Sequence, residues 1–172
     1  MNWTRSIAHG LRSRVFPGRW VEWSAPAALV LSVGSAAHAV QYLTIPDAQR
    51  RAFPGATSFT VVQVDRIWRA EAGSRVIGFF IFDRVIGKHL YIDYSVALDT
   101  GGRIRQVDIL QYRESYGGGI RSPSWLAQFV GKSSASPLQV GNDIRNISGA
   151  TLSSHHVTEG IQRIMTIADR LK

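Results

Sequence analysis

Residues 90–112 read LYIDYSVALDTGGRIRQVDILQY, and they contain the clearest strand pattern in the chain. In the first half every second residue is apolar, namely Leu90, Ile92, Tyr94, Val96 and Leu98. This period of two is typical of a β-strand that buries one face. Asp99-Thr100-Gly101-Gly102 then supplies turn residues, and residues 103–112 follow with a second strand pattern. The segment therefore predicts an antiparallel hairpin.

The segments before this hairpin also carry strand patterns. Residues 75–82 form an apolar run that suits a strand buried on both faces, and residues 58–69 alternate loosely. A break at residues 52–55, which contain proline and glycine, separates these strands from a short helical stretch at residues 47–51.

After the hairpin the pattern becomes helical. A glycine loop at residues 116–119 precedes Ser122-Pro123, which is typical of a helix N-cap followed by proline, and Gly131 ends this short helix. A longer helix is predicted from about Ser154 to Arg170, because apolar residues recur at spacings of four and three: Val157, Ile161, Ile164, Ala168 and Leu171. Together these elements predict an α+β fold, a single domain in which an antiparallel or mixed sheet packs with a few helices.

The first 39 residues differ from the rest of the chain. Four arginines and one glutamate precede an uncharged window from Trp23 to Pro46, and a short apolar run ends at Ala37-His38-Ala39. A basic start, an apolar core and an A-x-A ending are typical of a secretory signal peptide. An uncleaved membrane anchor is the alternative, and a buried core helix is a third.

The first two interpretations place the body of the protein outside the cytoplasm. We expect residues 1–39 to be a signal peptide or membrane anchor, residues 40–51 a short linker or helix, and residues 52–172 the functional domain. The protein is then periplasmic or otherwise extracytoplasmic, and it is attached to the inner membrane if the segment is retained.

Composition narrows the chemistry that this domain can perform. The chain has no cysteine, which excludes thiolate-bound iron–sulfur clusters, attached c-type haem, cysteine zinc sites and disulfides. The net charge is +8 for the full chain and +5 without residues 1–39, where 16 Lys and Arg face 11 Asp and Glu. The cations are scattered and no recognition-helix motif accompanies them, so we expect a basic surface rather than nucleic-acid binding.

Hydroxyl groups gather where the last helix is predicted to begin, in the segment SGATLSS at residues 148–154. Ser153 or Ser154 could cap the helix, while Gly149 and Ala150 allow a ligand or another backbone to come close. A helix N-terminus also favours a phosphate. The residues alone therefore leave two readings open, an anion site or simple capping. His155 and His156 are adjacent, so on a helix they point in different directions, and no metal site is expected.

The same segment resembles the S-G-A-T-x-[ST]-S signature of the FMN-binding domain family. That family includes flavin subunits of the sodium-translocating quinone reductase and related exported flavoproteins. Phe53-Pro54-Gly55-Ala56 is similar to the family's opening F-P-x-A. Residues 112–118 and 125–132 resemble its E-[ST]-x-G block and its W-x-x-Q-F-x-G-K helix. The resemblance covers residues 52–172 with its blocks in the family's order.

The resemblance implies that FMN is the cofactor and that it is joined by a phosphoester to Thr151. A separate magnesium-dependent flavin transferase that uses FAD would make the bond. The cofactor-binding residues implied by this match or placed next to it are Thr151, Ser148, Gly149, Ala150, Ser153, Ser154, Glu114 and Tyr116. One departure is Arg145, which stands where the family usually has an acidic residue, with Asp143 two positions earlier. If the transferase requires an acidic residue at this position, flavinylation would be slow, or FMN would be bound without a covalent bond.

The expected function is electron relay outside the cytoplasmic membrane, between a membrane-bound donor and a periplasmic or other extracytoplasmic redox partner. We expect a carrier or a subunit of a redox complex rather than a free-standing enzyme. One alternative is an exported accessory module without flavin that binds a phosphorylated or anionic ligand. A flavin reductase that acts on small acceptors is a second alternative.

Overall fold

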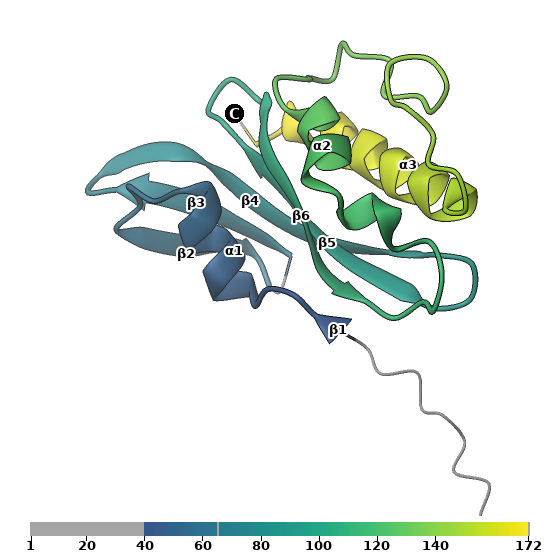
Figure 1. Ribbon diagram of the computed structural model, residues 1–172. Helices are drawn as coiled ribbons and strands as arrows, with labels where there is room; N and C mark the ends of the chain where they lie inside the picture. Colours follow the sequence, from purple (N-terminus) through teal and green to yellow (C-terminus); the bar gives the residue numbers. More distant parts are fainter. Residues whose placement is uncertain (1–39, 65, 172) are drawn as a thin grey trace, which may run out of the picture. The chain divides into compact units, whose positions relative to one another are not determined.

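The computed structural model describes residues 40–64 and 66–171, and the predicted signal peptide or anchor lies outside them. Six strands form one sheet in the order β1-β6-β5-β4-β3-β2, and all their pairings are antiparallel (Figure 1). The strands are β1 Val40–Gln41, β2 Ser58–Gln63, β3 Ile67–Ala72, β4 Arg75–Ile86, β5 Tyr91–Leu98 and β6 Ile104–Tyr112. The predicted hairpin is formed by β5 and β6, and the predicted α+β fold is confirmed.

The helices cover both faces of the sheet. They are α1 Ile45–Ala52, η1 Gly118–Arg121, α2 Pro123–Leu126, η2 Ala127–Phe129 and α3 Thr151–Ala168. Consecutive residues of β4 belong to different cores: Phe79 and Ile81 pack with α3, whereas Phe80 packs with α1. Since neighbouring side chains of a strand point to opposite faces, α3 and α1 lie on opposite sides of the sheet. Among the described residues, no helix is long and apolar enough to span a bilayer.

Two strand predictions need correction. The segment 58–69 is two strands, β2 and β3, because the chain turns near Val64 and Arg66, where neither glycine nor proline marks a turn in the sequence. Strand β5 was expected to bury one face, yet Asp93, Ser95 and Ala97 on its other face are also buried. Burial on both sides follows from the second layer that α1 forms. The expectation for residues 75–82, a strand buried on both faces, is confirmed by β4.

Helix α3 begins three residues earlier than predicted. Its first residue is Thr151 and its N-cap is Ala150, so Ser153 and Ser154 lie inside the first turn and do not cap the helix. The predicted start of the helix was wrong because serine is a far more common N-cap than alanine. The predicted buried face is confirmed, since Val157, Ile161, Ile164 and Ala168 are all in the core.

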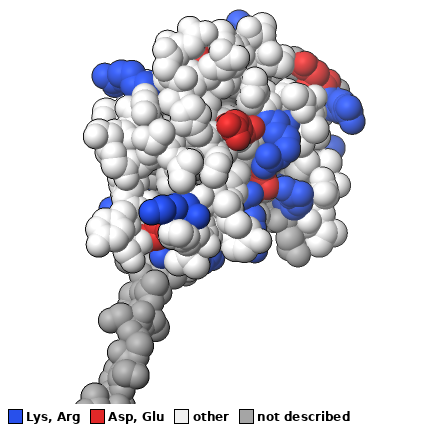
Figure 2. All heavy atoms as spheres, turned by 90° about the vertical axis from the view of Figure 1, so that its right-hand side faces the viewer, with Lys and Arg blue, Asp and Glu red and all other residues white. Residues whose placement is uncertain are grey.

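The buried carboxylates on the sheet form ion pairs with arginines. Asp83 is 4% exposed and contacts Arg66 from one side and Arg163 of α3 from the other, at 2.8 Å, while the hydroxyl of Tyr94 donates to it. Burial acts to raise the pKa of Asp83, but these donors outweigh it and hold the pKa below the ordinary value. Asp93 and Asp108 are likewise buried beside arginines. On the face shown in Figure 2, Lys and Arg side chains are spread out and several stand beside acidic groups.

The packing of α3 on the sheet predicts the effect of a charge at its centre. Ile161 has no exposed surface, so Ile161→Asp would bury a carboxylate without a partner and should lower the free energy of unfolding by about 3–5 kcal/mol. Gln162→Asp is the matched control on the exposed side of the same turn and should change stability by less than about 0.5 kcal/mol. Urea denaturation measures both. Equal stability of the two variants would contradict the assigned face.

Candidate functional site

Three separate segments meet at one end of the sheet and line a pocket of about 580 Å³. They are residues 88–90 between β4 and β5, residues 114–117 after β6, and residues 149–153 at the start of α3. Ligand sites in proteins commonly have volumes of about 300–1,000 Å³. The pocket therefore has the size of a site for a molecule as large as a nucleotide or a flavin.

The start of α3 supplies one wall of this pocket. Gly149 has a φ of +77°, a backbone conformation that glycine adopts without strain, and it turns the chain into the helix. Ala150, the N-cap, is buried and has no side-chain acceptor for the N–H groups of the first turn. These N–H groups and the helix dipole favour an anion at this end.

Thr151 stands at that end with an exposed side chain. Its Oγ1 lies 3.4 Å from the Nδ2 of Asn146, which can donate to it. The Oδ1 of Asn146 accepts from the hydroxyl of Ser154 and from the N–H of Ile147, both at 2.8 Å, so its orientation is fixed. Among the hydroxyls of residues 148–154, Thr151 is the one that combines an exposed side chain with a place in the pocket wall.

The β4–β5 loop is held from two sides. The carboxylate of Glu114 accepts from the N–H groups of His89 at 2.5 Å and Leu90 at 2.8 Å. Burial acts to raise the pKa of Glu114, but these N–H donors outweigh it and lower the pKa. On the other side, Nδ1 of His156 lies 2.7 Å from the carbonyl oxygen of Ile86 and 3.1 Å from that of Gly87, within donating distance. Glu114 and His156 thus fix the loop against β6 and α3.

The glycine loop after β6 closes the pocket on a third side. Gly117 has a φ of +83°, and a Cβ there would lie 2.9 Å from Tyr112 Oη and 3.3 Å from the Cβ of Ala150. The close approach of this loop to the start of α3 therefore requires glycine. Tyr112 is buried, and its hydroxyl donates to the carbonyl oxygen of Tyr116. The side chain of Tyr116 itself is 87% exposed.

The pocket combines apolar side chains with polar and charged groups. Leu90, Tyr116 and Leu152 line it and are exposed by 39%, 87% and 49%. Lys88 and His89 line it as well. Apolar side chains suit the ring system of a flavin, and uncapped helix N–H groups suit its phosphate. The residues present therefore fit FMN.

The structure brings together six of the eight residues that the sequence indicated. Glu114, Tyr116, Gly149, Ala150, Thr151 and Ser153 line the pocket. Ser148 and Ser154 are not part of its lining, and Ser154 is fully buried, with its hydroxyl donating to Asn146 and to the carbonyl oxygen of Thr151. Sequence reasoning missed residues 88–90 and the contact of His156 with the loop. Among the described residues no cluster of three metal-binding side chains occurs.

Asp143, the acidic residue that precedes the segment 148–154, is held by other contacts. Asp143 forms an ion pair with Lys132 at 2.7 Å and accepts from the N–H groups of Leu138 and Gln139. Arg145 is exposed, and its carbonyl oxygen accepts from the indole N–H of Trp125 at 2.8 Å. Asp143 is therefore a poor substitute for the acid that the family usually has at position 145.

The comparison with protein families agrees with this site. The model of the FMN-binding domain family matches residues 87–166, a range that contains all three pocket segments. The crystal structure of NqrC from Shewanella oneidensis is similar with 14% identity, covering 75% of each chain, at a TM-score of 0.44. No curated protein matches the chain. Residues 52–86 of the predicted domain precede the family match. Over residues 87–166 the chain matches the FMN-binding domain family, and this match indicates FMN as its cofactor.

Proposed function

We propose that this chain is an exported flavoprotein that carries FMN by a phosphoester on Thr151. In this proposal it relays electrons between a membrane-bound donor and an extracytoplasmic redox partner. The observation that carries the proposal is the position of Thr151, an exposed hydroxyl at the first residue of α3 and in the wall of the pocket. FMN, when bound, supplies the one- and two-electron chemistry.

The reaction that attaches FMN to Thr151 balances when FAD is the donor. The oxygen of the Thr151 hydroxyl forms a bond to the phosphorus of the FMN half, the bond between the two phosphates breaks, and AMP leaves. The hydroxyl proton is released. A separate flavin transferase would catalyse this exchange, and the exposed position of Thr151 is compatible with access by such an enzyme.

The chain's own residues would hold the cofactor. The N–H groups of the first turn of α3 would stabilise the phosphate, and the exposed apolar side chains Leu90 and Leu152 would face the ring. Glu114 would act through the β4–β5 loop, because its carboxylate is already occupied by backbone N–H groups of that loop.

The attachment is tested by co-expression with a flavin transferase. The intact mass should rise by one FMN less one water, and the band should fluoresce after denaturing electrophoresis. Thr151→Ala should lose both signals and keep its melting temperature, because an exposed hydroxyl contributes little to stability. Thr151→Val keeps the side-chain shape and should also be unlabelled. Label that persists in Thr151→Ala would refute the assignment, and a parent without flavin would favour the accessory-module alternative.

The role of Glu114 is tested separately from attachment. Glu114→Gln keeps the shape but replaces a charged acceptor with a neutral one, so the N–H groups of His89 and Leu90 should exchange faster with deuterium. The affinity for free FMN should fall by about tenfold, because a less ordered loop would reduce the binding free energy by roughly 1.4 kcal/mol. Ser115→Ala, a change beside it in the pocket wall, is the control. Unchanged exchange of residues 88–90 would show that Glu114 does not hold the loop.

Export is tested with a reporter fused after Lys172. The basic start and the Ala37-His38-Ala39 ending predict a mature chain that begins at Val40 or a chain anchored by residues 1–39 with its domain outside. A reporter that is active only outside the cytoplasm, such as alkaline phosphatase, should be active. Activity confined to a reporter that works only in the cytoplasm would exclude both forms.

A further inference from the structure

One edge of the sheet is open over the middle of β6. At one end, β1 pairs with Tyr112 and Gln111, and the N–H groups of Tyr42 and Leu43 donate to the carbonyl oxygen of Leu110. At the other end, Ile104 exchanges hydrogen bonds of 2.7 and 2.8 Å with Gly131 and Lys132. Between these contacts, residues 105–109 have no strand partner on this edge within the part of the chain that the structure describes.

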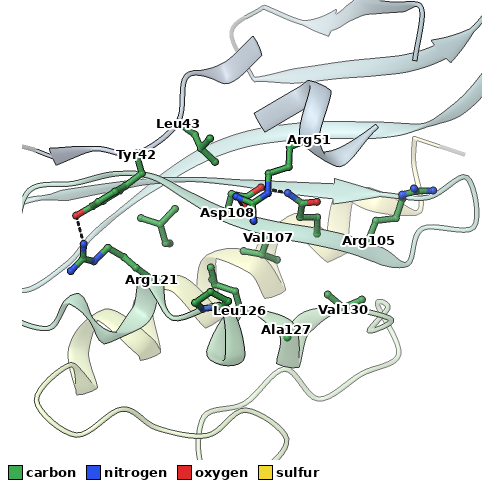
Figure 3. A pocket seen from close by; sticks show the side chains of 13 residues that line it. Tyr42, Leu43, Arg51, Arg105, Val107, Asp108, Arg121, Leu126, Ala127 and Val130 are labelled. Carbon is green, nitrogen blue, oxygen red and sulfur yellow. Dashed lines mark hydrogen bonds and ion pairs between the residues drawn. The ribbon is translucent and has the colours of Figure 1, made fainter. Parts of the chain in front are cut away.

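This open edge forms the floor of a groove of about 470 Å³ (Figure 3). One wall is the segment around α2 and η2, with Leu126, Ala127 and Val130. The other wall is the segment that leads from β1 through α1, with Tyr42, Leu43 and Arg51. Val130 is 53% exposed, so the groove offers apolar surface beside backbone groups.

Three arginines surround the groove, whereas Asp108 is the one carboxylate in its lining. Arg121 is fixed at one end, where it donates to Tyr42 Oη at 2.6 Å and to the carbonyl oxygen of Gly118 at 3.0 Å. Arg51 lies 3.3 Å from Asp108, which is buried. Arg105 is exposed at the other end, with its guanidinium 5.2 Å from the ring centroid of Phe53. After the pair of Arg51 and Asp108 is set aside, two positive charges remain, one at each end.

The geometry points to a docking groove for an extended acidic segment of a partner protein, which adds as a strand to β6. Its backbone would pair with residues 105–109, and its acidic side chains would meet Arg105 and Arg121. Apolar side chains of the segment would lie on Leu126 and Val130. Strand addition of this kind draws affinity from backbone hydrogen bonds and selectivity from the side-chain surroundings.

Charge decides between this partner and other occupants. Residues 1–39 of the same chain carry four arginines and one glutamate, so they would be repelled by the groove. A second copy of the chain presents the same arginines on its own β6 edge, so two such edges would repel each other. Anionic lipid would satisfy the arginines but could not use the unpaired backbone groups of the β6 edge. An acidic peptide satisfies both.

The inference does not depend on FMN, although the two sites share one loop. Tyr116 and Gly117 line the flavin pocket, and Arg121, five residues after Tyr116, lines the groove. A partner seated on β6 would therefore contact the loop that also closes the flavin pocket.

The test uses the full chain and a fluorescein-labelled six-residue peptide with two valines in its centre and two glutamates at each end, so that each end carries one carboxylate on each face of the added strand. Fluorescence anisotropy should show saturable binding, and the same peptide with lysine in place of glutamate should not bind. Amides within residues 105–109 should exchange more slowly when the acidic peptide is present. Because alternate amides of a strand face its neighbour, N-methylation of the amides at either the odd or the even positions of the peptide, but not of both equally, should abolish binding.

Charge variants give the second arm of the test. Arg105→Glu should weaken binding by about fivefold or more, and Arg75→Glu, a change at an exposed arginine outside the groove, should leave it within about twofold. Equal loss in both variants would reduce the effect to net charge and overturn the proposal. Equal binding by the two N-methylated peptides would also overturn the proposal, because backbone pairing would then play no part. Arg105-dependent binding to phosphatidylglycerol vesicles without peptide binding would overturn it in favour of a lipid surface.

Discussion

The close contact between α3 and the sheet at Gly160 positions the rest of the site. A Cβ at Gly160 would lie 2.8 Å from Val85 Cγ1 and closer still to the hydroxyl of Tyr94, so only glycine allows this approach. Tyr94 is itself held by the carboxylate of Asp83, which also binds Arg163 of α3. At Gly160 the backbone of α3 therefore packs directly against the side chains of Val85 on β4 and Tyr94 on β5. Its N-terminus, and Thr151 with it, is set against the loop that joins these two strands.

Two elements could be predicted from the sequence because their apolar periods are strong. The apolar pattern of the β5–β6 hairpin and that of the buried face of α3 each repeat over several residues, and the hairpin also has recognisable turn residues at 99–102. The start of α3 was misplaced because its N-cap, Ala150, carries no capping group, and the serines that look like caps lie inside the helix. The turn between β2 and β3 was missed because valines continue the strand pattern up to it. Local signals fail where tertiary packing, rather than local chemistry, ends an element.

The site was predicted in part, and mainly through the resemblance of residues 148–154 to a family signature. That signature identified Thr151, and the structure places Glu114 and Tyr116 in the same pocket. Residues 88–90 carry no comparable signal, since the loop takes its shape from hydrogen bonds between its backbone and the side chains of Glu114 and His156. Contacts of a side chain with a distant backbone leave no periodic trace in a sequence. From the sequence, His156 was considered as a candidate metal ligand, whereas in the structure its ring ties α3 to the loop.

The central claim is that FMN occupies the pocket formed by residues 88–90, 114–117 and 149–153. Hydrogen–deuterium exchange of the purified chain, measured with and without saturating free FMN, tests it most directly, because it locates the ligand without assuming a covalent bond. We predict slower exchange in these three segments together, and no change at residues 105–109 of the β6 edge. Protection confined to that edge and its arginines, or no protection anywhere, would contradict the account.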